Sequence, residues 1–431
     1  MSMHDELKSL HQVRDYEGIC AIYDRFENIQ ISELSEWDCI YLMNGLYKLN
    51  RYKDCLRIYK LCKHLDRDCD KLNDKMGWCV YHLYLKEFDF KNQPSTDFFK
   101  KADYVLGNIQ DGKFSPMWRI VKLAAEASVK NGAGNRPDYA RANDYLNRVD
   151  RENLSRDGES REKDDGKIIS LASDYETWFS MKTKCLLKMA AWDECINICD
   201  EGLSSIERFH YNNDSWFKYR KALCLLELGQ LKESLSVANE ILKTGFRHWS
   251  IYQLLYDIAA KQNDSDAAMK YAGYCALSDS IHEMRIKFYE GYADFLDEQG
   301  LKNEAMLHLQ LVVLIKQEKG WKLKEDKQQK IDGEISKLNK KETLERLRLF
   351  WQEHRDKDKV YISGTVSKLL PSGRDGFIKD DAGNGYYFNF RDVNFDHSAI
   401  EVGLAVKFTL EERLDKRKNV WKKNAVDVKL K

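Results

Sequence analysis

The sequence predicts a mostly α-helical chain that ends in a small all-β domain. Apolar residues recur at helical spacing from about Asp5 to Lys316, whereas apolar and polar residues alternate from Val360 onward. The period of the pattern therefore changes from about 3.6 to about 2 residues. Prolines are few, and three of the four lie between predicted helices: Pro94, Pro116 and Pro137.

Helical repeats are indicated by five short blocks that align with one another. Each block begins with a small or turn-forming residue, and five residues later it has a small residue followed by an apolar one. A small side chain at that point lets the second helix of a pair approach the first closely. The blocks begin at Asn50, Ala190, Gly229, Asn263 and Gly300, and their small residues are Cys55, Cys195, Ser234, Ala268 and Ala305.

This pattern resembles the tetratricopeptide repeat, whose period is about 34 residues. The resemblance implies stacked helix pairs in a right-handed superhelix, with a concave face lined mainly by the first helix of each pair. Such a groove would hold a protein partner, either an extended peptide or a helix. Gly229 and Gly300 are expected to end first helices in a left-handed conformation. Helix pairs are expected between Ser215 and Lys316, at Asp174–Glu201 and at Asp38–Lys63, with irregular helices at 70–150.

Two segments depart from the repeats. A strongly polar stretch at about 152–170 is expected to be a mobile surface loop. A long charged helix is expected from Trp321 to His354, since a single apolar stripe runs along it and suits a helix that caps a solenoid. Arg355–Lys359 contains no apolar residue and is interpreted as a linker. The expected domains are therefore 1–320, 321–358 and 359–431.

The last part of the chain contains five predicted strands in about 70 residues. The second and third are joined by the turn Asp380–Gly385, which is rich in Asp, Asn and Gly. A closed barrel suits five strands of this length, because closure removes the exposed edges of an open sheet. The strands are expected at Val360–Leu369, around Gly376–Ile378, at Tyr386–Phe390, at Ala405–Glu411 and at Asn424–Leu430.

These strands resemble the cold-shock domains, which are OB-fold barrels that bind single-stranded RNA or DNA. Three segments carry the resemblance most clearly: Gly364-Thr365-Val366, Gly376-Phe377-Ile378 and Tyr387-Phe388-Asn389-Phe390. Val402–Phe408 and Ala425–Val428 are similar to the last two strands of that family. The sequence departs from the family at Asp375, Lys368 and Asn389, where an aromatic residue, a tryptophan and a histidine are usual.

The resemblance implies a contact surface for an unpaired strand. Rings would stack on bases and cations would meet phosphates. A net charge of +6 from Trp321 onward, against −6 for the rest of the chain, favours this function slightly. The alternative is a barrel that serves as a protein-docking module in a multiprotein scaffold. The expected contact residues are Lys368, Phe377, Tyr387, Phe390 and Arg391, with a second basic cluster at Lys416, Arg417 and Lys418.

No pattern predicts catalysis, a metal site or a cofactor. Cys195 and Cys199 lie one helical turn apart, but no further Cys or His has the spacing of a closed zinc site. Glycine-rich phosphate loops, nucleophile elbows and paired catalytic carboxylates are not found. An odd number of cysteines, a polar N-terminus and the lack of a long apolar run favour a soluble cytoplasmic protein with reduced thiols.

Overall fold

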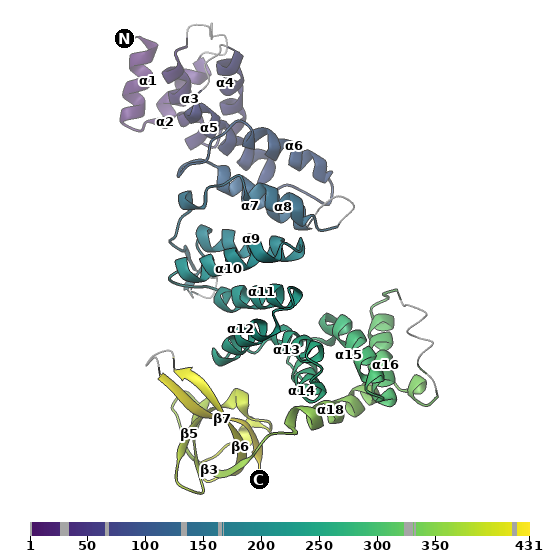
Figure 1. The fold of residues 1–431 in the computed structure, drawn as a ribbon. Helices are drawn as coiled ribbons and strands as arrows, with labels where there is room; N and C mark the ends of the chain where they lie inside the picture. Colours follow the sequence, from purple (N-terminus) through teal and green to yellow (C-terminus); the bar gives the residue numbers. More distant parts are fainter. Residues whose placement is uncertain are drawn as a thin grey trace. The chain divides into compact units, whose positions relative to one another are not determined.

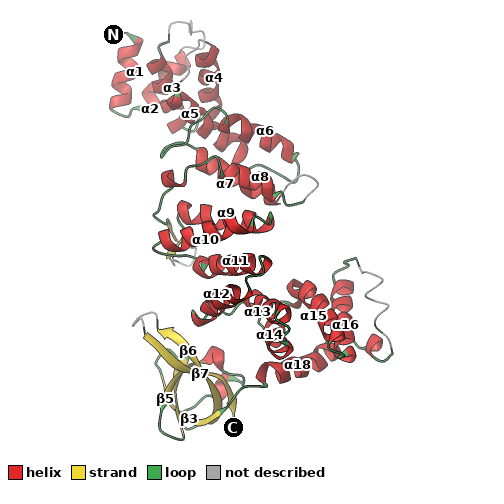
Figure 2. Ribbon diagram, in the orientation of Figure 1, coloured by secondary structure: helices red, strands yellow, loops and turns green. Residues whose placement is uncertain are grey.

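The computed structural model describes residues 2–25, 34–64, 69–130, 136–162, 166, 168–322, 331, 333–415 and 420–431. Tetratricopeptide-like helix pairs are followed by a closed five-stranded barrel, as the sequence predicts (Figures 1 and 2). The chain divides into two compact units, Met1–Arg220 and Lys221–Lys431.

The described part of the N-terminal unit is mostly α-helical and includes a π-helical turn, η2 (Tyr81–Leu85). Serine side chains cap the N-termini of several of these helices. The Ser35 hydroxyl accepts a hydrogen bond from the Asp38 amide, and the Asp38 carboxylate accepts one in return, which fixes the start of α3. The helices are α1 (Met3–Gln12), α2 (Tyr16–Arg25), α3 (Glu36–Lys48), α4 (Tyr52–His64), α5 (Asp70–Val80), α6 (Ser95–Leu106), α7 (Met117–Lys130), α8 (Tyr139–Leu146), α9 (Asp174–Lys188) and α10 (Trp192–Ser205).

The C-terminal unit begins within α11 (Asn213–Glu227), and its helices continue the same pairwise arrangement. The three pairs predicted between Ser215 and Lys316 are confirmed as α11 with α12, α13 with α14 and α15 with α16. The bounds are α12 (Leu231–Lys243), α13 (Trp249–Lys261), α14 (Ser265–Ala276), α15 (Ile286–Glu298), α16 (Lys302–Glu318) and α18 (Lys340–Asp356).

The small residue of each repeat block is buried where the two helices of a pair meet. Ser234 on α12 donates a hydrogen bond to the carbonyl of Ala222 on α11, at 2.7 Å. The thiols of Cys55 and Cys195 make the same kind of contact, each to a carbonyl twelve residues earlier. A polar but small side chain therefore satisfies a first-helix carbonyl without separating the helices.

The turn before each second helix is left-handed at the first residue of the block. The φ angles are 76° at Gly229 and 80° at Gly300, as expected for glycine. Asn50, Ala190 and Asn263 adopt the same conformation, with φ of 58°, 59° and 58°. Asparagine tolerates this region, whereas for alanine it costs about 1 kcal/mol.

We therefore expect Ala190→Gly to stabilise the N-terminal unit by about 1 kcal/mol, because glycine has no Cβ to strain a positive φ. The free energy of unfolding, measured by urea denaturation, should rise accordingly. Ala140→Gly is the matched control, because Ala140 is exposed on α8, where glycine should cost about 1 kcal/mol. A loss of stability in both variants would contradict the strain at Ala190.

Two features of the N-terminal unit were not predicted. The stretch expected to be a mobile loop contains a small antiparallel sheet, β1 (Ser160–Glu162) with β2 (Ile168–Ser170), although all three β1 residues are exposed as the polar sequence suggests. Cys39 on α3 and Cys62 on α4 form a disulfide, so the prediction of reduced thiols throughout is wrong for this pair. Packing of α3 against α4 brings these two residues together, and no local spacing indicates it.

The charged helix is shorter than predicted. Residues 321 and 322 are not helical, 323–330 lie outside the described residues, and α18 begins only at Lys340. Asn339 starts it with a capping box to Glu342. Two residues of the expected apolar stripe, Leu347 and Trp351, are fully buried on it.

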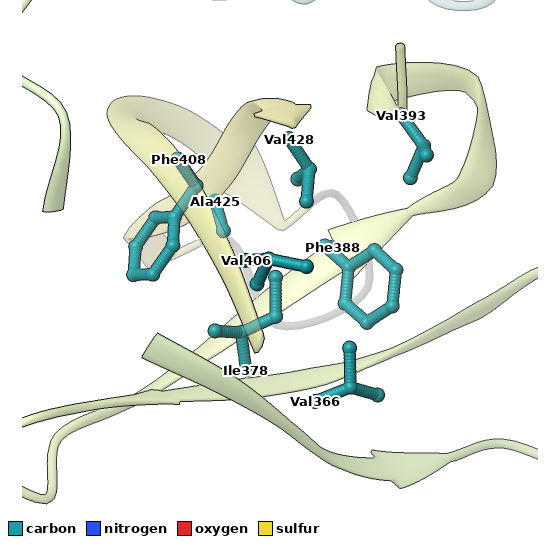
Figure 3. Packing of buried hydrophobic residues seen from close by; sticks show 8 residues of the cluster. All are labelled: Val366, Ile378, Phe388, Val393, Val406, Phe408, Ala425 and Val428. Carbon is teal, nitrogen blue, oxygen red and sulfur yellow. The ribbon is translucent and has the colours of Figure 1, made fainter. Parts of the chain in front are cut away.

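The barrel contains β3 (Ile362–Leu369), β4 (Asp375–Asp380), β5 (Gly385–Asn389), β6 (Ala405–Asp415) and β7 (Val420–Leu430). Its strands follow the order β3-β4-β5-β7-β6, closed by antiparallel pairing of β3 with β6, and β5 pairs with β7 in parallel. Figure 3 shows the buried residues of the strands meeting in one core, together with Val393 from the segment after η7. The core consists of Val366, Ile378, Phe388, Val393, Val406, Phe408, Ala425 and Val428.

The segment interpreted as a linker is instead an ionic junction between α18 and the barrel. Lys359 lies 2.7 Å from Asp356 and 2.5 Å from Asp427 on β7. Lys429 lies 3.2 Å from Asp356. Burial acts to raise the pKa of Asp356, but hydrogen bonds from Arg355 and Lys359 outweigh it and hold that pKa well below its usual range. This segment contains no apolar residue, and ion pairs hold it against the barrel instead.

Candidate nucleic-acid interface

Three of the predicted contact residues form one row across the outer face of the barrel. Lys368 on β3 is paired with Phe377 on β4, and Phe377 is paired with Tyr387 on β5. The row continues to Asn424 on β7, which is the parallel partner of Tyr387. Phe377 and Tyr387 alternate with the buried residues Ile378 and Phe388, and Lys368 is exposed, so these side chains point away from the core. The structure therefore brings a cation and two rings together.

The two rings differ in exposure. Phe377 is 36% exposed, whereas Tyr387 is half-buried beside it. Their ring centroids are 5.8 Å apart and their planes are inclined at 75°, an edge-to-face contact. Phe377 therefore offers the more accessible ring, and Tyr387 limits its movement on one side.

The hydroxyl of Tyr387 donates a hydrogen bond to the Asp375 carboxylate at 3.0 Å. Burial raises the pKa of Tyr387, and the adjacent Asp375 raises it further. The hydroxyl therefore stays neutral, and its ring is held in one orientation. Asp375, which replaces an aromatic residue of the cold-shock pattern, positions a ring instead of supplying one.

Gly376 sets the spacing between β3 and β4. A Cβ atom at this position would lie 2.4 Å from the carbonyl oxygen of Lys368 and 2.9 Å from the Phe388 ring. Only glycine allows this approach, and a β-bulge at Ser367 and Lys368 completes the fit. Together they place Lys368 opposite Phe377.

Phe390 does not join the row. Its ring is stacked on Phe388 at 5.8 Å and lies 5.6 Å from His397, and it packs against the barrel core. The chain turns into the short 3-10 helix η7 (Phe390–Asp392) at this point, which directs Phe390 inward and leaves Arg391 exposed. Of the three rings expected on the contact surface, Phe377 and Tyr387 therefore lie in the row and Phe390 does not.

The remaining expected residues are placed as follows. Asn389, which stands where the cold-shock pattern has histidine, accepts a hydrogen bond from the Arg391 amide at 3.0 Å. The Asn389 side chain therefore caps η7, and its oxygen is occupied by this hydrogen bond from the backbone. Lys416, Arg417 and Lys418 lie outside the described residues.

An exposed tryptophan on β7 was missed, and it lies on the opposite face of that strand from Asn424. Trp421 is 47% exposed on β7, near the end of the β6–β7 ribbon. It has the same strand parity as the core residue Ala425, but four residues further out it no longer meets the core. The signal was present in the sequence as a tryptophan before Lys422 and Lys423, outside any motif of the family.

Among the described residues, the ion pairs between the barrel and the helical part of its unit involve β6 and β7. Arg247, in the turn after α12, pairs with Glu411 on β6. Asp427 on β7 holds the ionic junction described above. Among the described residues, the ring and hydrogen-bond partners of Phe377 and Tyr387 belong to the barrel itself. The row is thus left uncovered by the helices.

Cations around the row are unequally available. Lys368, Arg374 and Arg391 are exposed. Arg413 is not available in the same way, because its guanidinium lies 2.8 and 2.9 Å from the two carboxylate oxygens of Asp392. Positive charge near the rings therefore comes from Lys368 on β3, from the β3–β4 turn and from η7.

The described part of the chain offers neither a metal cluster nor a membrane-spanning helix. No three His, Cys, Asp or Glu side chains there gather as metal ligands would. None of the described helices is both long enough and apolar enough to cross a membrane.

Comparison with known proteins gives a limited result. Residues 215–356, from α11 to the end of α18, match a domain of unknown function, DUF7017. No curated protein matches the chain.

Among solved structures, the chain is similar to a tetratricopeptide repeat protein from Parabacteroides merdae, with 10% identity over 65% of this chain and 93% of that one, and a TM-score of 0.27. It is also similar to the human IFIT1 dimer with PPP-AAAA, with 10% identity, coverage of 75% and 72%, and a TM-score of 0.33. A third is Cut9–Hcn1 of the APC/C, with 11% identity, coverage of 82% and 71%, and a TM-score of 0.25. Scores this low carry no argument about function.

Proposed function

We propose that the protein is a non-enzymatic adaptor that binds single-stranded RNA or DNA through its barrel and a protein partner through its helical repeats. The observation that carries the proposal is the row Lys368, Phe377 and Tyr387 on one outer face of the barrel. An exposed ring beside a second ring and a cation is the arrangement that unpaired bases and phosphates require.

The strand topology supports this proposal. In OB-folds, oligonucleotides bind on the face of the second and third strands and on the loops that follow the first and fourth. The corresponding elements here are β4, β5, the β3–β4 turn and the loop between β6 and β7. The two rings lie on β4 and β5, Arg374 lies in the first loop, and Lys416–Lys418 belong to the second. The strand face therefore supplies rings, and each of the two loops supplies cations.

The ring surface is expected to bind weakly and with little sequence preference. Stacking is worth about 1–3 kcal/mol per base and tolerates every base. Two platforms therefore give a modest affinity. The helical pairs of residues 1–320 would then hold the protein that the barrel brings to the strand.

We expect the full chain to bind a fluorescein-labelled 20-nucleotide single strand more tightly than the same sequence as a duplex, with an affinity that falls as salt rises. Fluorescence anisotropy at 25, 100 and 300 mM KCl measures the affinity for the single strand and for the duplex, and the dependence of each affinity on salt. Single-stranded RNA and DNA are tested in parallel. Absence of binding to either at 25 mM KCl would overturn the proposal, and equal binding to the duplex would remove the role of stacking.

The protein-docking alternative draws on a specific observation. The barrel already contacts α18 through Lys429 and the turn after α12 through Glu411. That contact uses β6 and β7, however, and leaves the β4–β5 face uncovered. The alternative predicts no loss of oligonucleotide affinity when the rings are removed.

A further inference from the structure

The N-terminal unit contains a cleft with an unusual distribution of charge. It consists of two adjoining hollows of about 340 and 240 Å³, which share Val80, Tyr84 and Tyr104. Five cationic residues line it, from α4 and α6, and none of the described lining residues carries a carboxylate. The cations are Lys53, Arg57, Lys60, Lys100 and Lys101.

One wall of this cleft is a single face of α4. Lys53, Leu56, Arg57 and Lys60 follow helical spacing, so three cations lie along about 10 Å of the helix. Among the described residues, no carboxylate forms an ion pair with Lys53, Lys60 or Lys100. These charges repel one another, and an anionic occupant would relieve that repulsion.

The floor and the mouth of the cleft are apolar. Met76 and Val80 on α5 are buried at the floor, whereas Tyr84 and Tyr104 at the mouth are 40% and 52% exposed. Tyr84 lies in the π-helical turn η2, a feature that is frequent at functional sites. The Lys101 ammonium lies 5.8 Å from the centre of the Tyr84 ring and partly shields it.

We propose that this cleft binds an acidic peptide segment of a protein partner, with one apolar side chain inserted between Tyr84 and Tyr104. The cationic rim suits the carboxylates, and the aliphatic floor suits the apolar anchor. A polynucleotide would also satisfy the rim and would find rings at Tyr84 and Tyr104, but the aliphatic floor of Leu56, Met76 and Val80 favours an inserted apolar side chain over the polar edge of a base. This inference rests on the proposed protein-binding role of the repeats and specifies the chemistry of the partner.

The test begins with a phage-displayed library of random twelve-residue peptides selected on the full chain. The expected outcome is enrichment of peptides in which two or more Asp or Glu residues flank one Leu, Met, Phe or Trp. The best peptide is then synthesised and titrated by fluorescence anisotropy. Lys53→Glu combined with Lys60→Glu should weaken its binding at least about tenfold, and Tyr84→Ala with Tyr104→Ala should do the same.

Lys184→Glu with Lys188→Glu is the matched control, because both lysines are exposed on α9 of the same unit. It should leave the affinity unchanged. Enrichment of peptides without acidic residues, no enrichment, or an equal effect of the control would overturn the proposal.

The same variants separate this inference from the barrel hypothesis. Reversal of charge at Lys53 and Lys60 should not change the affinity for a single-stranded oligonucleotide if the cleft is a peptide site. Loss of oligonucleotide affinity in that variant would make the cleft a nucleic-acid surface and overturn the peptide assignment. Loss of oligonucleotide binding on removal of the barrel rings leaves the peptide result unaffected.

Discussion

Replacement of both barrel rings, Phe377→Ala with Tyr387→Ala, should weaken the binding of a single-stranded oligonucleotide by about 30-fold or more. Each stacked base contributes about 1–3 kcal/mol, and a factor of ten corresponds to about 1.4 kcal/mol. Both side chains point away from the barrel core, so the fold should survive their removal. Fluorescence anisotropy at low salt measures the change, and circular dichroism verifies the fold.

Two further variants sharpen this prediction. Phe114→Ala with Tyr211→Ala removes two exposed rings from the N-terminal unit and should leave the affinity unchanged. Phe390→Leu keeps an apolar side chain against the barrel core but removes a ring that the family pattern assigns to stacking. Because Phe390 packs inward, its replacement should change the affinity less than twofold. A large loss with Phe390→Leu would contradict the two-ring platform.

Trp351→Ala should be the most destabilising single change in the C-terminal unit. Trp351 is 1% exposed on α18, stacks on Tyr289 at 5.8 Å, and donates a hydrogen bond to His308 at 2.9 Å. Truncation of a buried tryptophan costs about 3–5 kcal/mol. It also leaves the His308 acceptor unpaired in a fully buried site, which adds to the cost.

Hydrogen exchange measured by mass spectrometry locates this effect. Amides of α16 and α18 should exchange faster in Trp351→Ala, because Trp351 holds α18 on the preceding pair of helices. Leu349→Ala on the same helix is the control, since Leu349 is 70% exposed and its truncation should change the stability by less than about 0.5 kcal/mol. Equal exchange rates of the α16 and α18 amides in the two variants would show that contacts other than those of Trp351 hold α18 in place.

The repeats were predictable because their pattern is local. The residue that begins each block adopts the left-handed turn, and the small residue after it reaches a carbonyl of the first helix twelve positions earlier. Both features involve residues close in sequence. The barrel strands were predictable for the same reason, since alternation and the turn at Asp380–Gly385 are also local signals.

Features that depend on distant residues were not predictable in this way. The disulfide of Cys39 with Cys62 requires α3 and α4 to pack in one register. The inward position of Phe390 depends on a turn into η7 that no periodicity marks. The junction of Lys359 with Asp427 joins residues 68 positions apart, so a stretch without apolar residues was interpreted as a linker.

The central claim is that an unpaired strand lies on the β4–β5 face, and photochemical cross-linking tests it most directly. The full chain is irradiated with a single-stranded oligonucleotide that carries 4-thiouridine, and the modified residues are identified by mass spectrometry. The account predicts adducts at Phe377 or Tyr387 and their neighbours on β4 and β5. Adducts confined to the helices, or no adducts in the barrel at saturating oligonucleotide, would contradict it.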